Sequence, residues 1–260
     1  MDLKEQDVLG GATGSHWYYR SKSDALVRLL SGHAPRRVLD VGAGSGFFSR
    51  ELLARTAARE AMCVDTGYEG DRDDLASGKP LRFRRACGPT VDADCMLMMD
   101  VLEHVPDDHR LLADYARRLP PGALVVITVP AFAFLWSGHD VFLGHQRRYT
   151  LAQVEALARG TGLEVLAGAY LFAMVLPVAA AKRLLSRAVH GMKPRSELAR
   201  HSALVNVVLR AACAFELPWF TFNRLAGLTA CCVARTPPLS LLLAARAGDT
   251  APPRRPASRR

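Results

Sequence analysis

Residues 38–48 read Val38-Leu39-Asp40-Val41-Gly42-Ala43-Gly44-Ser45-Gly46-Phe47-Phe48, an apolar run that breaks into three alternating glycines and two aromatic residues. The apolar and partly β-branched run is typical of a buried strand. Glycines let the backbone turn sharply and approach a ligand without clashes from Cβ atoms. The stretch therefore predicts a strand, a nucleotide-type ligand site at the turn over residues 42–46, and a helix that begins around Phe47.

The spacing of the glycines narrows the class of ligand. A dinucleotide fingerprint, G-x-G-x-x-G, needs its third glycine where this chain has Phe47, which argues against nicotinamide-dependent oxidoreduction. The pattern Asp-x-Gly-x-Gly-x-Gly instead resembles motif I of the class I S-adenosylmethionine-dependent methyltransferases. The resemblance implies S-adenosylmethionine as cofactor. It places cofactor contacts at Asp40, Gly42, Ala43, Gly44 and Gly46, although an acid at position 40 more often braces the turn.

Two later segments support the same family. Residues 61–65 are predicted to form a second buried strand that ends in Asp65, about the ~20-residue separation expected for a carboxylate that accepts hydrogen bonds from ribose hydroxyls. Residues 94–105 resemble the fourth strand and following loop of the family, which implies cofactor contacts from Asp100 and Val101. Glu103 and His104 either contact the methionine portion of the cofactor or cap a short helix before Pro106.

Helices and strands alternate through the first half of the chain, as a parallel sheet requires. Ser23 is predicted to cap a helix over residues 25–30, and Asp107 or Asp108 to start another. Residues 123–129 form an apolar run typical of a central strand covered on both faces. Thr150 and Gln153 form a capping box for a helix over residues 151–158, and a sixth strand is expected over residues 163–167.

Residues 228–235 fit a closing strand, which in the family is antiparallel to its neighbours. The expected fold class is α/β, a doubly wound, mostly parallel, seven-stranded Rossmann-like sheet with a helical insertion between strands six and seven. We expect one methyltransferase domain over residues 1–248. Within it, residues 170–227 form either a helical lid or an interfacial element. Residues 249–260 are rich in proline and arginine and are expected to be a disordered basic tail.

The composition suits one large core, because half of the 260 residues are apolar. The six cysteines show no C-x-x-C spacing and fall mostly on predicted strands, so we expect reduced thiols of a cytoplasmic protein, with neither disulfides nor a bound metal. The first residues are acidic and basic rather than apolar, so we expect no secretion signal.

The net charge of +9 is concentrated in the tail and in the insertion. Residues 170–181 are apolar but shorter than the ~18 to 20 residues of a membrane span. A basic cluster follows them, and residues 204–222 are predicted to form an amphipathic helix with an aromatic end. The insertion is therefore a lid over the substrate cleft, a peripheral membrane contact, or both. The basic cluster comprises Lys182, Arg183, Arg187, Lys193, Arg195 and Arg200, opposed by Glu197.

A nucleic-acid partner is not expected. The chain shows no basic run interleaved with aromatic residues, no zinc-finger spacing, and no motif of the kind that base methyltransferases place around a flipped base.

The segment after the fifth predicted strand, residues 134–149, contains Trp-Ser-x-His-Asp and then Gly-His-x-Arg-Arg-Tyr. It resembles a subgroup of bacterial class I methyltransferases often associated with glycan or secondary-metabolite pathways. The same subgroup carries an aromatic and arginine entry motif like residues 16–20, which implies that Tyr18 and Arg20 cover the cofactor. The whole resemblance spans residues 16–235 and is strongest in the glycine motif.

A hydroxyl acceptor of the methyl group must lose a proton, and imidazole exchanges protons near neutral pH. His139 is the candidate base, with Asp140 or another carboxylate fixing its tautomer, and His145 is the competing candidate. The acceptor is expected to contact Trp136, Arg147, Arg148 and Tyr149, with the arginines binding an anionic group. Equally, the histidines brace the loop, Arg147 pairs with Asp140, and Tyr149 belongs to the core.

Strand three departs from the family pattern. Where the family usually has the acid that contacts adenine, the chain has Arg84, Arg85, Ala86 and Cys87.

The function expected from the motifs above is S-adenosylmethionine-dependent O-methylation of a small or amphiphilic acceptor, such as a glycan, a lipid-linked intermediate or a natural product. The alternative is a non-catalytic, cofactor-binding regulatory or scaffold subunit of the same fold.

Overall fold

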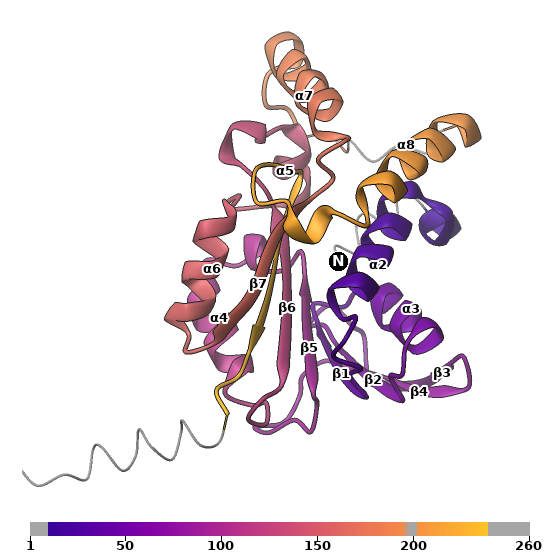
Figure 1. The fold of residues 1–260 in the computed structure, drawn as a ribbon, viewed down its shortest axis with the longest axis vertical. Coiled ribbons are helices and arrows are strands. Elements are labelled where there is room, and N and C mark those ends of the chain that lie inside the picture. Colours follow the sequence, from indigo (N-terminus) through magenta and orange to yellow (C-terminus); the bar gives the residue numbers. More distant parts are fainter. Residues whose placement is uncertain (1–9, 195, 197–201, 239–260) are drawn as a thin grey trace, which may run out of the picture.

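The computed structural model describes residues 10–194, 196 and 202–238. They form an eight-stranded sheet in the order β3-β4-β2-β1-β5-β6-β8-β7, with helices on both faces (Figure 1). Neighbouring strands from β4 to β6 are parallel, whereas β3, and β8 with both of its neighbours, pair antiparallel. The strands are β1 (Arg37–Val41), β2 (Glu60–Val64), β3 (Arg72–Ala76), β4 (Lys79–Arg84), β5 (Cys95–Met99), β6 (Leu124–Pro130), β7 (Glu164–Leu171) and β8 (Thr229–Arg235).

Two helical layers cover the sheet, and a third group of helices lies beyond the carboxyl ends of its parallel strands (Figure 1). The first layer holds α2 (Trp17–Leu29) and α3 (Phe47–Arg55), and the second holds α4 (Asp108–Ala116) and α6 (Leu151–Gly160). The third group holds α5 (Gly138–Leu143), α7 (Leu176–His190) and α8 (Ala203–Glu216). The 3-10 turns are η1 (Gly10–Ser15), η2 (Leu102–His104), η3 (Ala133–Leu135) and η4 (Phe220–Phe222).

The predicted α/β class is confirmed, including the antiparallel last strand β8 and a helix that begins at Phe47. The predicted starts at Asp107 and Thr150 are also observed, since their side chains cap α4 and α6. The sheet has eight strands rather than seven because β3 forms a hairpin with β4. Four of the five β3 residues are exposed, so the strand has no hydrophobic signature. Its turn, Ser77-Gly78 with φ of 52° and 73°, suits a two-residue hairpin loop.

The predicted cap at Ser23 is wrong. Helix α2 begins six residues earlier, where the side chain of His16 accepts a hydrogen bond from the Tyr18 amide. The Trp17 amide donates to Oδ1 of Asn206 at 2.7 Å, so a residue of α8 also caps this helix. Ser23 lies inside the helix, buried, and donates to Glu51 at 3.1 Å.

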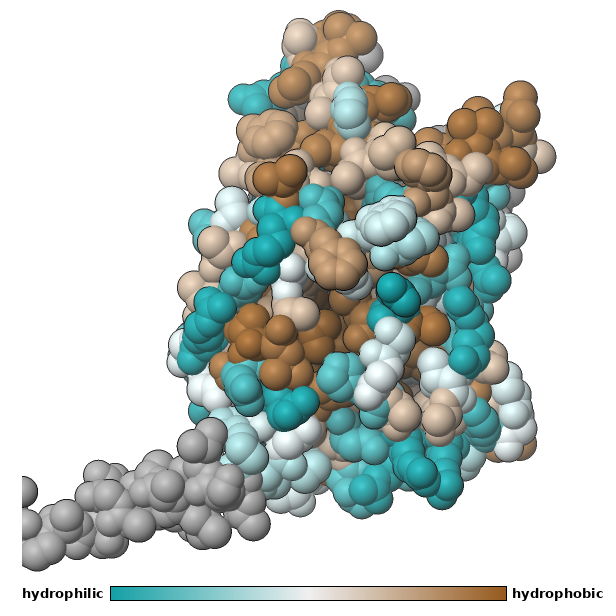
Figure 2. Space-filling model, in the orientation of Figure 1, coloured by the Kyte–Doolittle hydropathy of each residue, from teal (hydrophilic) through white to brown (hydrophobic). Residues whose placement is uncertain are grey.

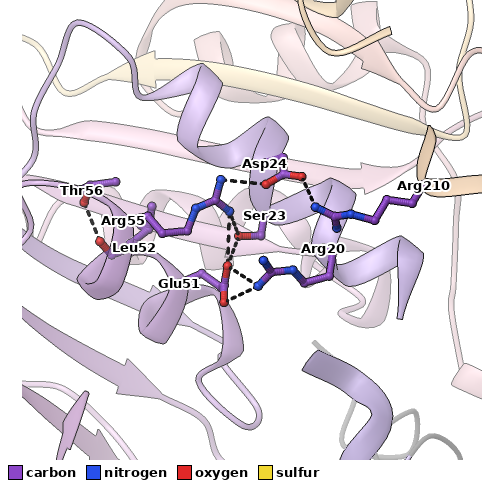
Figure 3. Close-up of polar contacts among 8 residues, drawn as sticks. All are labelled: Arg20, Ser23, Asp24, Glu51, Leu52, Arg55, Thr56 and Arg210. Atoms are coloured by element: carbon purple, nitrogen blue, oxygen red, sulfur yellow. Dashed lines mark hydrogen bonds and ion pairs between the residues drawn. The ribbon is translucent and has the colours of Figure 1, made fainter. Parts of the chain in front are cut away.

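Charged side chains join α2 to α3 and to α8 (Figure 3). Arg20 pairs with Glu51 at 3.0 Å, and Arg55 of α3 pairs with Asp24 of α2 at 2.7 Å. Arg210 of α8 reaches the other oxygen of Asp24 at 3.1 Å. The insertion is therefore attached to the helix that precedes the first strand.

The described part of the insertion forms two main helices, α7 and α8. Residues 170 and 171 complete β7, α7 covers 176–190, and the predicted amphipathic helix over 204–222 is α8 followed by η4. In the described part of the chain, none of the helices combines the length and apolar character needed to cross a bilayer. The predicted tail over 249–260, and Arg195, Glu197 and Arg200 of the basic cluster, lie outside the described residues.

Candidate active site

The turn after β1 adopts a conformation that requires glycine. Gly42, Gly44 and Gly46 have φ values of +66°, +53° and +72°, in the left-handed region that side chains with a Cβ atom rarely adopt. A Cβ on Gly42 would lie 2.7 Å from a methyl group of Val101, and one on Gly46 would lie 3.1 Å from the sulfur of Cys63. The turn is thus packed directly against the ends of β2 and β5.

Asp65 follows β2 and is held beside this turn. Its Oδ2 atom accepts a hydrogen bond from the Gly44 amide at 3.0 Å, and its Oδ1 atom accepts from the Gly67 amide at 2.9 Å. Tyr68 donates its hydroxyl to the Gly44 carbonyl at 2.6 Å. These bonds fix the carboxylate at the carboxyl edge of the sheet, where open α/β sheets bind their ligands.

Asp40 lies beneath the turn, buried in the core. The Ser49 hydroxyl donates to its Oδ2 atom at 2.8 Å, which ties the end of β1 to α3. Burial raises the pKa of Asp40 from 3.8 to about 6, and the Ser49 hydrogen bond opposes part of that rise. The position favours the bracing role over direct contact with a ligand.

This raised pKa makes stability depend on pH. Below pH 3.8 the carboxyl is protonated in both the folded and unfolded states; between pH 4 and pH 6 only the folded state keeps the proton. Stability therefore falls as pH rises through this window, by roughly 3 kcal/mol for a shift of this size. We expect Asp40→Asn to remove this loss, because the amide oxygen still accepts from Ser49. Urea unfolding of the wild type and of Asp40→Asn at pH 4, 5 and 7 measures the change in the free energy of unfolding with pH.

The control for this experiment is Asp92→Asn, since Asp92 is 75% exposed and pairs with Arg37 on the surface. It should follow the wild-type pH profile. If Asp40→Asn also follows the wild-type profile, Asp40 ionises in the folded protein as it does in the unfolded chain.

Asp100 follows β5 in a left-handed conformation, with φ of +55°. Its Oδ1 atom accepts from Thr128 at 3.2 Å, and its Oδ2 atom accepts from the Tyr18 hydroxyl at 3.2 Å and pairs with Lys22. Burial tends to raise the pKa of Asp100, but the Lys22 ammonium outweighs it and lowers the pKa. The sequence interpretation missed Lys22, although its i, i+4 spacing from Tyr18 places both on one face of α2.

A cavity of about 320 Å³ extends from Tyr18 and Asp100 to α7 and α8. One wall is polar and lies at the carboxyl ends of β5 and β6; it consists of Asp100, Glu103, His104, His139, His145 and Arg148. A second wall is mostly apolar and comes from α5, the insertion and the residue before β8. Its members are Leu143, Val175, Val178, Ala179, Lys182, Arg183, Val205, Leu209 and Leu228.

Asp140 organises the polar wall and is fully buried. Its Oδ1 atom lies 2.8 Å from Nδ1 of His145 and 2.7 Å from Nε of Arg148, and its Oδ2 atom accepts from Arg148 and from the Ser137 amide. Burial opposes ionisation, but the His145 hydrogen bond and the Arg148 charge hold the pKa of Asp140 well below its usual range.

The predicted pairing of Arg147 with Asp140 is wrong, because Arg148 takes that place. Arg147 instead pairs with Asp108 at 2.9 Å, and Tyr149 donates its hydroxyl to the same carboxylate at 2.8 Å. The two side chains point toward the start of α4. Tyr149 is buried in the core of this half of the sheet.

Of the predicted acceptor site, His139, His145 and Arg148 line the cavity, whereas Trp136, Arg147 and Tyr149 are not among the residues that line it. Asp140 orients His145 through a hydrogen bond of 2.8 Å, so the carboxylate–imidazole pair forms with the second histidine candidate. Arg20 is directed to Glu51 of α3. The catalytic and acceptor-binding roles of these residues stay predictions.

The sequence analysis left two roles open for Glu103, a contact with the cofactor or a helix cap. It lies in η2, is completely buried and lines the cavity, and among the described residues neither carboxyl oxygen has a hydrogen-bond partner. Burial and the neighbouring Asp100 raise the pKa of Glu103 well above its usual range.

Arg84 stands where the family pattern has the acid that contacts adenine. It ends β4 and pairs across the hairpin with Asp73 at 2.6 Å.

Comparisons with known proteins agree with this geometry. The family model described as a methyltransferase domain matches residues 15–167. Uncharacterized methyltransferases of Mycobacterium bovis and Mycobacterium tuberculosis are 34% identical over 121 residues, a match that covers 42% of this chain. The chain spans only 45% of the length of these curated relatives.

Two solved structures share the fold at low sequence identity. The methyltransferase in complex with the Haloferax volcanii Trm112 activator has a TM-score of 0.54 and 18% identity, covering 91% of this chain and 99% of that one. A methyltransferase from Archaeoglobus fulgidus has a TM-score of 0.51 and 16% identity, covering 90% and 98%. Because the family model matches more than half of the residues, the chain belongs to the class I S-adenosylmethionine-dependent methyltransferase family.

Proposed function

We propose that the protein transfers the methyl group of S-adenosylmethionine to a hydroxyl oxygen of an amphiphilic acceptor. The observation that carries this proposal is the two-sided cavity, which has a polar wall at the carboxyl ends of the strands and an apolar wall that continues into α7 and α8. A polar head group fits the first wall, and an acyl or other apolar tail fits the second.

In this proposal the turn over residues 42–46 and Asp65 hold the nucleoside of the cofactor. After β5, Val101 packs against the turn and Asp100 lines the cavity, and in this proposal both hold the cofactor where it faces the acceptor. Methyl transfer is an in-line displacement, so alignment of the acceptor oxygen, methyl carbon and sulfur supplies much of the rate, about 7–11 kcal/mol in favourable cases.

The acceptor hydroxyl must also lose its proton. His139 lies on α5 in the polar wall and is the proposed base, with His145 as the second candidate. Arg148 pairs with Asp140, and Lys182 lines the cavity from α7, so Lys182 is the proposed source of positive charge for an anionic head group.

The outer faces of α7 and α8 are apolar and exposed. Figure 2 shows hydrophobic surface gathered on these projecting helices. The exposed apolar residues of α7 and α8 outside the cavity lining include Leu185, Val189, Leu204, Val207, Val208 and Phe215. Lys182, Arg183 and Arg187 lie on the same helix as several of them. We propose that this surface inserts peripherally into an anionic lipid surface on the cytoplasmic side, where each basic residue adds about 1 kcal/mol.

The chemical part is tested by incubating the protein with methyl-labelled S-adenosylmethionine and a bacterial lipid extract. We expect label in the lipid fraction as methyl ethers, and no label after the extract has been acetylated. His139→Ala should lower turnover by about 10²–10⁴-fold with unchanged cofactor affinity, the range for loss of a general base. Label on nitrogen contradicts O-methylation, and cofactor binding without transfer indicates the non-catalytic alternative.

The membrane part uses flotation with anionic and neutral vesicles. The wild-type protein should float with anionic vesicles, and the triple variant Leu185→Glu/Val189→Glu/Val207→Glu should stay in the aqueous fraction. Leu75→Glu is the matched control, because Leu75 is an exposed apolar residue on the remote strand β3. A wild-type protein that stays in the aqueous fraction contradicts membrane contact.

A further inference from the structure

Three side chains with metal-ligating atoms meet on the polar wall of the cavity. One ligand atom from each of Glu103, His104 and His145 lies within 4.8 Å of the other two. A first-row divalent ion holds nitrogen and oxygen ligands about 2.0–2.2 Å away, so its ligands lie within roughly 4.4 Å of one another. The observed spacing of 4.8 Å or less is close to that range.

The Glu103 carboxyl lacks a compensating charge. The buried carboxylates near it each pair with a cation, Asp100 with Lys22 and Asp140 with Arg148. Across the described residues no ion pair involves Glu103, and neither of its oxygens has a hydrogen-bond partner. Burial without a partner disfavours the ionised form of this carboxyl, and a bound cation offsets that penalty.

His145 is already oriented as a metal ligand. Its Nδ1 atom is hydrogen-bonded to Asp140, which leaves Nε2 as the atom that can donate its lone pair. A carboxylate that fixes the other nitrogen of a ligating histidine is the usual second contact around a protein-bound metal. The ring centroids of His104 and His145 are 4.7 Å apart, so the two imidazoles are adjacent.

The backbone holds the two contributing segments together. The Gln146 amide donates to the Glu103 carbonyl at 2.7 Å, and the Gln146 side chain donates to the His104 carbonyl at 3.0 Å. The residues on either side of the candidate site are therefore joined before any ion binds. Such preorganisation lowers the entropy cost of assembling a three-ligand site.

We propose that Glu103, His104 and Nε2 of His145 bind one divalent transition-metal ion, Zn²⁺ or Mn²⁺. One carboxylate and two imidazoles suit these ions, and three protein ligands leave coordination positions open toward the cavity. The cysteine spacing led us to expect no bound metal, but the ligands proposed here are a carboxylate and two histidines. An ion at this place would polarise an acceptor oxygen, a role that rests on the proposed function, and His139 would remain the base.

The test measures metal binding alone, on chelator-treated full-length protein without cofactor or acceptor. We expect calorimetry with Zn²⁺ and electron paramagnetic resonance with Mn²⁺ to show one ion per chain. Glu103→Gln and His145→Gln should each weaken binding at least tenfold. Glu164→Gln and His33→Gln are the matched controls, since both residues are exposed and neither lines the cavity, and should bind as the wild type does.

Thermal unfolding supplies a second readout, because an ion that binds only the folded state raises the unfolding temperature. Saturating Zn²⁺ should raise it in the wild type and the controls but not in the site variants. If Glu103→Gln does not fold, His145→Gln and His104→Asn decide the matter by the same criteria. No stoichiometric binding, or equal binding by the site variants, overturns the metal site. Metal binding without methyl transfer keeps the site and rejects the proposed function.

Discussion

Asp140→Ala is expected to lower the free energy of unfolding by about 3–5 kcal/mol, the usual cost of removing one partner from a buried ion pair. Arg148 is 7% exposed and bonds both carboxylate oxygens of Asp140, so the substitution removes two charged hydrogen bonds from a buried guanidinium. The Ser137 amide and Nδ1 of His145 lose their acceptor at the same time. Urea denaturation followed by circular dichroism measures the loss.

Two further variants show whether loss of the Asp140–Arg148 ion pair causes the fall in the free energy of unfolding. Asp114→Ala removes the carboxylate that pairs with Arg117 on the surface of α4 and should cost less than about 1 kcal/mol. The double variant Asp140→Ala/Arg148→Met removes both charges and should recover a large part of the stability. A loss below 1 kcal/mol in Asp140→Ala itself would mean that the Arg148 guanidinium can reach water.

Asp65→Ala is expected to raise the dissociation constant for S-adenosylmethionine at least tenfold. The carboxylate is fixed beside the glycine turn by two backbone amides, and in the proposed function it accepts hydrogen bonds from the ribose hydroxyls. Hydrogen bonds to a charged group are worth about 1.5–3 kcal/mol each, so losing even one changes affinity by about tenfold or more. Isothermal titration calorimetry with the purified protein measures the effect.

Asp71→Ala is the control for this measurement, because Asp71 is an exposed acid of the same loop region that pairs weakly with Arg84. It should bind the cofactor as the wild type does. An unchanged dissociation constant in Asp65→Ala would show that the ribose is bound elsewhere, and with it that the glycine turn has another role.

The parts of the fold that local sequence determines were predictable. The glycine turn, the helix start at Phe47 and the acid that ends β2 depend on residues close together in the chain, and their geometry follows from glycine conformation and strand periodicity. The capping boxes follow the same rule, since Thr150 and Gln153 are three residues apart.

The parts that depend on distant partners were not predictable. Helix α2 begins at Trp17 because Asn206, 189 residues away, accepts its amide hydrogen bond. Adjacent arginines at 147 and 148 are equivalent in the sequence, and only the fold decides that the second one meets Asp140. The unpaired state of Glu103 likewise follows from which cations the fold places beside Asp100 and Asp140.

The connection between β7 and β8 has a consequence for how this enzyme family diversifies. The two strands are antiparallel neighbours, with Leu171 opposite Thr229, so the chain leaves the sheet and returns to it at one point. Asn223 bonds the backbone of Tyr170 there, which closes the base of the insertion. The segment between Leu171 and Thr229 can therefore be replaced by another without changing the strands and the glycine turn. Relatives can evolve new acceptors in this way while the cofactor site is retained.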